Sequence, residues 1–158
     1  MRLLNNPCLN IVLYEPQIPQ NTGNIARLCA ATKCHLILLG KLGFDLGDKY
    51  LKRAGLDYWK FVSWEHISNS ESFFVSLTQE SFSFLSVHNK KPYTEICPKF
   101  GDFLFFGKET TGLPKKWMES FPNRCFTIPM WEKGVRSLNL GSSVAVVLYD
   151  GLRKLEKF

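Results

Sequence analysis

Polar side chains gather in a short stretch near the end of the chain, between an apolar segment and a helix rich in small residues. The stretch contains Arg136, Ser137 and Asn139, and it follows the apolar residues 126–130. The helix predicted after it starts at Asn139. Backbone N–H groups at the start of a helix bind polar or anionic ligands well. This turn therefore predicts one wall of a polar binding site.

Two further stretches have the same character. Residues 20–27 contain Asn21 and Arg27, and residues 107–114 contain Glu109. Both come after apolar runs that are predicted to be strands. Ligands of an open parallel sheet bind beyond the carboxyl ends of its strands. On residue types alone, the three stretches predict a pocket of asparagine, arginine, glutamate and serine.

Several familiar kinds of site are missing from the sequence. The five cysteines include no C-x-x-C pair and the three histidines are scattered, so no metal site is expected. No G-x-S-x-G elbow is present. The first predicted strand is followed by Glu-Pro-Gln-Ile-Pro at 15–19 and not by G-x-G-x-x-G. The glycines at 107 and 112 are followed by Leu-Pro, which does not fit a phosphate-binding P-loop.

Length and composition indicate one globular domain spanning residues 1–158. The chain is 45% apolar and 22% charged, and its formal net charge is +6. A positive charge favours polyanionic partners. The amino terminus shows no secretory signal, and the apolar runs fall short of the roughly 18 residues of a membrane helix. We therefore expect a cytoplasmic protein that does not bind a membrane.

Strands and helices alternate along the predicted chain. The strands are continuous apolar runs, which is typical of a mostly parallel sheet with helices on both faces. Strands are expected at 9–14, 35–39, 58–64, 82–87, 102–107 and 124–129. Helices are expected at 25–32, 48–53, 70–79, 115–120 and 139–155. Asn21 or Thr22 could cap the first helix, and Ser70 could cap the third.

The three polar stretches resemble the signature motifs of a known family, the SPOUT RNA methyltransferases. More narrowly, the chain is similar to small stand-alone members that 2′-O-methylate the wobble nucleotide of transfer RNA. The likeness extends over nearly the full length. The motifs are Asn21-Thr22-Gly23-Asn24-x-x-Arg27, Gly107-x-Glu109-x-x-Gly112-Leu113-Pro114, and Ile128-Pro129-Met130 leading to Arg136-Ser137-Leu138-Asn139-Leu140.

This resemblance implies a deep trefoil knot near the carboxyl terminus, which general rules of topology would not predict. It also implies that S-adenosylmethionine binds in the knotted loops, largely through backbone groups, with no metal. A further contact falls on Leu85 or Ser86, where the family pattern does not fix the register. The other implied cofactor contacts are Gly107, Ile128, Met130, Ser137 and Leu138.

The resemblance also assigns catalytic roles, to Arg27, Asn21, Glu109, Ser137 and Asn139. A guanidinium holds its proton above about pH 12, so Arg27 is unsuited to act as a general base. We expect Arg27 to anchor a phosphate and the reacting hydroxyl, while a phosphate oxygen or water accepts the proton. Asn139 and Ser137 would fix the ribose and the loop. Glu109 would hold Arg27 or the loop backbone.

The implied partners are the anticodon loop of transfer RNA and a second copy of the chain. Two other interpretations stay open: a 2′-O-methyltransferase of ribosomal RNA, and a non-catalytic RNA-binding module of the same fold. Basic residues beside the three motifs are candidate phosphate contacts. They are Lys90, Lys91, Lys108, Lys115, Lys116, Lys133 and Arg136.

Overall fold

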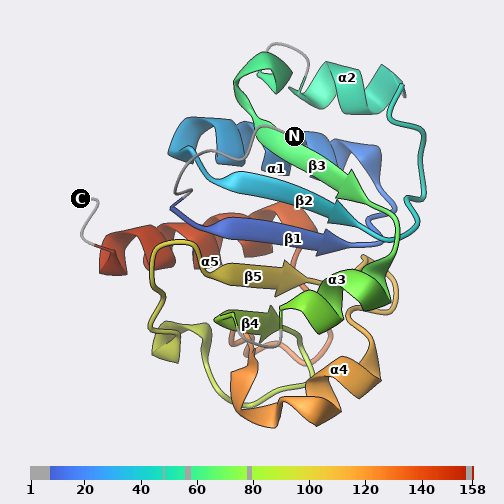
Figure 1. Cartoon of the computed structure of the whole chain (residues 1–158). Coiled ribbons are helices and arrows are strands. Elements are labelled where there is room, and N and C mark those ends of the chain that lie inside the picture. The colour runs from blue at the N-terminus through green and yellow to red at the C-terminus, as the bar shows by residue number, and fades with distance from the viewer. Residues whose placement is uncertain (1–7, 48, 56–57, 78–79, 156–157) are drawn as a thin grey trace.

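The computed structural model of the chain describes residues 8–47, 49–55, 58–77, 80–155 and 158. At its centre is a six-stranded sheet whose strand pairings are all parallel, as predicted (Figure 1). Its strands, in spatial order, are β3 (Ser63–Ile67), β2 (His35–Leu39), β1 (Asn10–Tyr14), β5 (Phe103–Phe106), β4 (Phe82–Leu85) and β6 (Cys125–Phe126). Their carboxyl ends therefore share one edge of the sheet.

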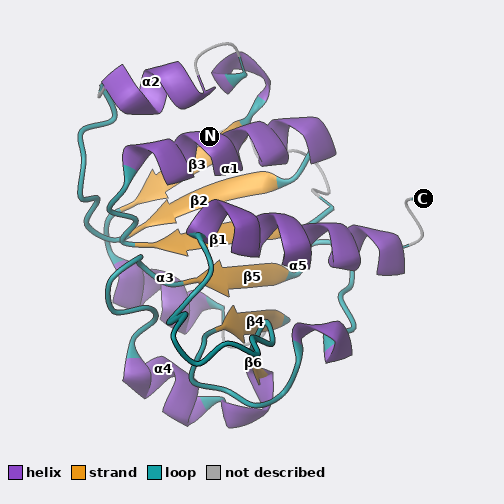
Figure 2. Cartoon of the chain, turned by 180° about the vertical axis from the view of Figure 1, so that it is seen from behind, coloured by secondary structure: helices purple, strands orange, loops and turns teal. Residues whose placement is uncertain are grey.

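Helices cover both faces of this sheet, which confirms the predicted layering. Helices α1 (Pro19–Thr32) and α5 (Leu140–Lys154) lie on one face, and α3 (Ser70–Ser76) and α4 (Lys115–Ser120) lie on the other (Figures 1 and 2). Helix α2 (Lys49–Gly55) packs against α1. Short 3₁₀ turns are η1 (Trp59–Phe61), η2 (Tyr93–Glu95) and η3 (Pro122–Arg124). Within the described ranges, no helix has the length and apolar character needed to cross a bilayer.

The strands bury side chains on both faces because successive residues point to opposite sides. In β1, Ile11 and Leu13 pack in the cluster that includes α1 and α5. Val12, between them, packs in a second cluster with Phe74 of α3 and Trp117 of α4. The last two rings are stacked with their centroids 4.5 Å apart. Two buried faces explain why the strands are continuous apolar runs.

The third strand lies later in the chain than the sequence predicts. Residues 58–64 were the expected strand, whereas residues 59–61 form η1 and β3 starts at Ser63. The aromatic residues that suggested a strand pack locally instead, with the rings of Trp59 and Trp64 meeting edge to face at 5.1 Å. Since β3 is an edge strand paired only with β2, its own residues do not form an apolar run.

The first helix begins earlier than predicted: it was expected at 25–32, whereas residues 19–24 are helical as well. Helix α1 starts at Pro19, and Ile18 occupies its N-cap without a side-chain hydrogen bond. The capping role predicted for Asn21 or Thr22 is therefore wrong. Proline fits the first helical position because its fixed φ suits the helix and it lacks an N–H that would need a partner.

Smaller boundary differences occur elsewhere. Asn69, not Ser70, caps α3, and its side chain accepts a hydrogen bond from the Ser72 N–H at 2.9 Å. The fourth, fifth and sixth strands are shorter than predicted. Residue 48 of the second predicted helix and residues 78–79 of the third lie outside the described residues.

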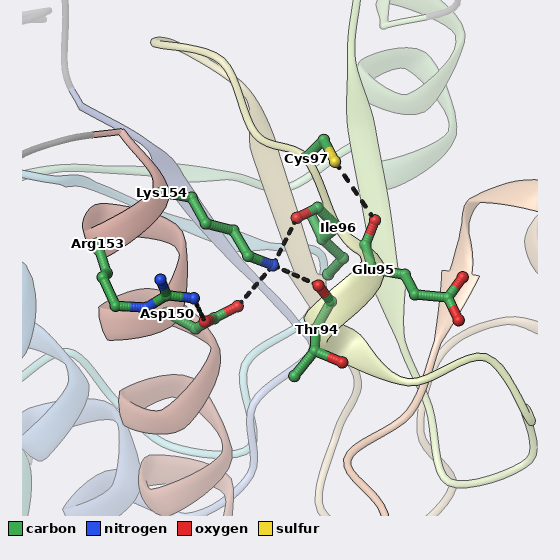
Figure 3. Close-up of polar contacts among 7 residues, drawn as sticks. All are labelled: Thr94, Glu95, Ile96, Cys97, Asp150, Arg153 and Lys154. Carbon is green, nitrogen blue, oxygen red and sulfur yellow. Dashed lines mark hydrogen bonds and ion pairs between the residues drawn. The ribbon is translucent and has the colours of Figure 1, made fainter.

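The end of α5 is tied to the connection between β4 and β5. The Lys154 ammonium donates hydrogen bonds to the carbonyl oxygens of Thr94 and Ile96, at 2.5 and 2.8 Å (Figure 3). It also pairs with the Asp150 carboxylate at 2.8 Å, one turn earlier in the helix. Asp150 accepts a further hydrogen bond from Arg153 at 2.9 Å. These contacts fix the last helix against a segment about 60 residues away in the sequence.

Candidate active site

Glu109, in the loop after β5, binds the start of α1. Its carboxylate accepts hydrogen bonds from the backbone N–H groups of Gln17 and Ile18, at 2.9 and 3.1 Å. It also accepts one from the side-chain amide of Asn21 at 3.2 Å. Because Ile18 offers no capping oxygen, this distant carboxylate takes the place of a cap residue. An anion is also favourable beside the positive end of a helix dipole.

The loop that presents Glu109 is closed tightly on itself. The Gly112 N–H donates to the Lys108 carbonyl at 2.9 Å, and Gly112 has φ +71°, which favours glycine. A Cβ on Gly107 would clash with the backbone of Gly112 and Leu113. Glycine at 107 is therefore required by the closure of this loop. The glutamate is held in place by backbone geometry and not by side-chain packing alone.

Asn139 joins a third segment to this site. Its amide donates a hydrogen bond to the Asn21 side-chain oxygen at 3.0 Å, across 118 residues of sequence. Its own oxygen accepts the Ser142 N–H at 3.2 Å and so caps α5. Asn21 is 7% exposed and is held between the other two residues. We call Asn21, Glu109 and Asn139 the Glu109 cluster. The structure thus brings together three of the five residues predicted to be catalytic.

An ion pair lies beside the cluster at the ends of β1 and β5. The Lys108 ammonium is 2.8 Å from the Glu15 carboxylate. This hydrogen bond to Glu15 raises the pKa of Lys108, and burial raises the pKa of the neighbouring Tyr14. Glu15 has φ +44°, an uncommon value for a residue with a side chain. Sequence reasoning missed Glu15 because its partner is 93 residues away.

Arg27 lies on α1, and no described hydrogen bond joins it to the Glu109 cluster. Its side chain is exposed, and its guanidinium carbon lies 4.7 Å from the centre of the Tyr58 ring. A cation over an aromatic face is attracted by about 0.5–1 kcal/mol at exposed sites. Glu109 was expected to hold Arg27 or the loop backbone: no described hydrogen bond joins it to Arg27, and its carboxylate accepts from the backbone N–H groups of Gln17 and Ile18. The role of Arg27 stays a prediction.

Three predicted cofactor contacts lie at neighbouring strand ends. Leu85 ends β4, Gly107 follows β5, and Ile128 follows β6 by two residues. Since β5, β4 and β6 are adjacent in the sheet, the loops that carry these residues leave the same part of its edge. The backbone N–H of Ser86, the alternative to Leu85, donates to the Phe126 carbonyl at 2.9 Å and extends the sheet.

The remaining predicted contacts lie in the connection from β6 to α5. Met130 is half-buried, and every residue from 131 to 139 is exposed, including Ser137 and Leu138. Trp131 is 90% exposed, which excludes a place in the core for its ring. This connection therefore exposes both polar and apolar side chains between the sheet edge and the start of α5.

The predicted phosphate contacts fall into two groups. Four lysines have a carboxylate partner: Lys91 with Glu95, Lys108 with Glu15, Lys115 with Glu119, and Lys116 with Glu71. Within the described ranges, no ion pair is seen for the other three, which are Lys90, Lys133 and Arg136. All three are exposed. These three side chains are therefore better placed to contact a phosphate than the four lysines that already pair with a carboxylate.

The site combines a fixed hydrogen-bonded centre with exposed surroundings. Of its charged groups, Glu109 is satisfied by N–H donors, and Lys108 by Glu15. The described residues contain no group of three or more His, Cys, Asp and Glu side chains placed to hold a metal. What the arrangement offers is amide groups and backbone at the carboxyl edge of the sheet, with an exposed arginine farther along α1. Such groups position a polar substrate.

Comparison with known proteins identifies the family. Residues 8–149 match the model of the SpoU rRNA Methylase family. The tRNA (cytidine(34)-2′-O)-methyltransferase of Saccharophagus degradans is 44% identical over 148 residues, which are 92% of this chain and 95% of that protein. A solved structure described as "Structural insights into the 2-OH methylation of C/U34 on tRNA" is 40% identical, with a TM-score of 0.87 over 96% of this chain and 99% of that one.

A more distant structure shares the fold alone. The SpoU methyltransferase AviRb of Streptomyces viridochromogenes, solved in complex with the cofactor AdoMet, is 20% identical to this chain. Its TM-score is 0.82, over 98% of this chain and 63% of that one. The family match covers most of the chain, and the 44% identical relative matches 92% of it. The chain belongs to the SpoU rRNA methylase family.

Proposed function

We propose that the protein transfers a methyl group from S-adenosylmethionine to the ribose 2′-hydroxyl of the wobble nucleotide in the anticodon loop of transfer RNA. The observation that carries this proposal is the Glu109 cluster, in which three segments far apart in the sequence meet at the carboxyl edge of the sheet. The 44% identity to a tRNA (cytidine(34)-2′-O)-methyltransferase supports the choice of substrate. With this substrate, the cytoplasm is the compartment that we propose.

The residues present fit such a methyl donor. The loops after β4, β5 and β6 leave adjacent strand ends, and half-buried Ile128 and Met130 lie next to polar backbone. We assign donor contacts to Leu85, Gly107, Ile128, Met130, Ser137 and Leu138. When bound, S-adenosylmethionine supplies a methyl group made reactive by its positively charged sulfur, so no metal is required. A ligand of mixed character suits apolar side chains and backbone hydrogen bonds together.

The protein's own task is to hold the hydroxyl and to provide for the loss of its proton. Arg27 cannot accept that proton, because guanidinium stays charged. In our proposal Arg27 lies against Tyr58 through one face and directs its N–H groups to a substrate phosphate and hydroxyl. The proton passes to a phosphate oxygen or to water. Asn139 and Ser137 position the ribose, and Asn21 and Glu109 keep Asn139 in place.

We further propose that residues 1–158 form one methyltransferase domain whose carboxyl-terminal part is knotted. Two observations support a threaded chain. Thr127, just after β6, exchanges backbone hydrogen bonds at 2.8 Å with Lys91 and Tyr93 of the connection between β4 and β5. Farther along, Lys154 binds carbonyl groups of the same connection. The chain from β6 to the end of α5 is thus held along one loop at two points.

A homodimer is the assembly that we propose. Val146 and Tyr149, three residues apart on α5, are exposed, and so are Trp131 and Leu138 in the connection before it. Exposed apolar groups of this kind mark interaction surfaces. Sedimentation of the purified protein tests the assembly: a monomer at micromolar concentration would exclude it.

Methyl transfer to isolated RNA tests the function. The protein is incubated with labelled S-adenosylmethionine and either total transfer RNA or ribosomal RNA, and the product is digested and mapped. We expect label only in transfer RNA, as a 2′-O-methyl group on the wobble nucleotide. Label in ribosomal RNA would contradict the proposed substrate. Binding of RNA without any transfer would indicate a non-catalytic module.

A further inference from the structure

A pocket that the proposed reaction does not use lies at the carboxyl ends of β2 and β3. Its volume is about 430 Å³. The residues that line it come from the loop after β2 and from the end of β3. They are Gly40, Lys41, Leu42, Phe44, Leu46, His66 and Ser68. We call this the β2–β3 pocket. Pockets of roughly 300–1,000 Å³ hold small ligands in proteins.

The lining is apolar in the middle and polar at the rim. Leu42 and Phe44 are half-buried, and Leu46 is 38% exposed. Lys41 is exposed at the rim. The His66 Nε2 lies 2.9 Å from the Gly40 carbonyl oxygen and therefore carries the hydrogen that it donates. In the neutral ring, Nδ1 is then an acceptor. The pocket thus offers an aromatic side chain, apolar walls, the His66 ring acceptor, the Ser68 hydroxyl and the Lys41 cation.

The pocket borders directly on the candidate active site. A Cβ on Gly40 would lie 2.8 Å from the Glu15 side chain, and a Cβ on Gly43 would lie 2.7 Å from the Gln17 Cα. The Gly43 N–H also donates to the Pro16 carbonyl at 3.0 Å. Gln17 is one of the residues whose N–H binds Glu109. A single stretch of backbone, residues 15–17, therefore separates the pocket from the Glu109 cluster.

We propose that the β2–β3 pocket binds one nucleobase of the RNA substrate, from a nucleotide that flanks the methylated one. The proposal rests on the proposed function and adds a base-binding subsite to it. Single-stranded RNA is commonly bound with its bases unstacked from each other and packed on aromatic side chains. Phe44 and the two leucines supply such a surface.

Charge favours an anionic occupant such as RNA over a neutral ligand. Lys41 at the rim can contact the phosphate of the inserted nucleotide. Lys52 and Arg53 are exposed on α2, which follows the same loop. The chain as a whole has a net charge of +6. The pocket therefore combines a surface for a base with positive charge for the backbone on either side of it.

The test measures the dissociation constant of an RNA hairpin that carries an anticodon loop with cytidine at the wobble position. Leu46→Ser removes apolar wall, and Lys41→Ala removes the rim cation. We expect Leu46→Ser to weaken binding about tenfold. Lys41→Ala should weaken it less and lower the slope of log affinity against log salt by about one. Val75→Ser, at an exposed site on α3 away from the pocket, is the matched control and should change neither value.

A second set of hairpins identifies the base. Each has one loop nucleotide made abasic, and each is measured with the wild type and with Leu46→Ser. At one flanking position the losses of affinity caused by the abasic nucleotide and by Leu46→Ser should be non-additive. A nucleotide without its base makes no contact with Leu46 that the substitution could remove. Additive losses at every position would overturn the subsite, as would a Leu46→Ser variant that binds like the wild type. A hairpin that shows the coupling but is never methylated would overturn the proposed reaction and leave the subsite standing.

Discussion

Glutamine in place of Glu109 preserves the shape of the side chain but removes its charge and one of its two acceptor oxygens. One carboxylate oxygen accepts from Ile18 and Asn21, and the other accepts from Gln17. An amide has a single acceptor oxygen, so its NH₂ group must face at least one of these N–H donors. The start of α1 then loses a bond, since the capping residue Ile18 offers no replacement.

The size of the loss follows from these contacts. A hydrogen bond to a charged group contributes about 1.5–3 kcal/mol, and an anion at a helix start adds roughly 0.3–1 kcal/mol. We therefore expect Glu109→Gln to lower the free energy of unfolding by about 2 kcal/mol. For a chain of this size that corresponds to a fall in Tm of about 4–8 °C. Because the same side chain also anchors Asn21, kcat/KM for methyl transfer should fall on the order of 10- to 100-fold.

Thermal unfolding followed by circular dichroism, together with methyl-transfer kinetics, measures both effects. Glu119→Gln is the matched control, since it removes the same charge from an exposed residue whose partner Lys115 is 3.6 Å away. The control substitution should lower the free energy of unfolding by less than about 0.5 kcal/mol. If Glu109→Gln matched the control in both Tm and kcat/KM, the idea that Glu109 caps α1 and positions the site would be refuted.

Three further perturbations follow from single contacts. Asn139→Ala removes the cap of α5 and should lower the free energy of unfolding by about 1 kcal/mol, measured in urea, with a larger loss in kcat than in donor affinity. Replacing the ring under Arg27 should raise KM for RNA in Tyr58→Leu but not in Tyr58→Phe; equal KM values would refute the contact. Burial raises the pKa of Asp150, but hydrogen bonds from Lys154 and Arg153 outweigh it and the net pKa is lowered. Asp150→Asn should therefore cost about 1 kcal/mol at pH 7, and urea titrations should show this difference vanish as the pH falls below about 4.

The sequence predicts those parts of the fold whose signal is local. β1 and β2 are buried on both faces, so each is a short apolar run, followed by Glu15-Pro16 after β1 and by Gly40 after β2. The bounds of β3 could not be predicted in this way, because it is an edge strand and the aromatic residues before it pack as a turn. The start of α1 could not be predicted from the local sequence either, for a different reason. Its cap is a carboxylate 91 residues away, which no local pattern could reveal.

In the candidate site, too, some features could be predicted from the sequence and others could not. Asn21, Glu109 and Asn139 were predicted from their motifs, but the hydrogen bonds among them depend on the sheet order, which places β1 beside β5. The pairing of Lys108 with Glu15 has the same origin, and it removes Lys108 from the set of open phosphate contacts. The contact of Arg27 with Tyr58 could not be predicted, because residue 58 was placed in a strand.

The most direct measurement for the central claim is a structure of the protein bound to S-adenosylhomocysteine and an anticodon hairpin. The account predicts that the cofactor product contacts the loops after β4, β5 and β6, with the ribose of the wobble nucleotide beside Asn139 and its phosphate near Arg27. A cofactor bound away from these loops, or a ribose that does not reach the Glu109 cluster, would contradict the account.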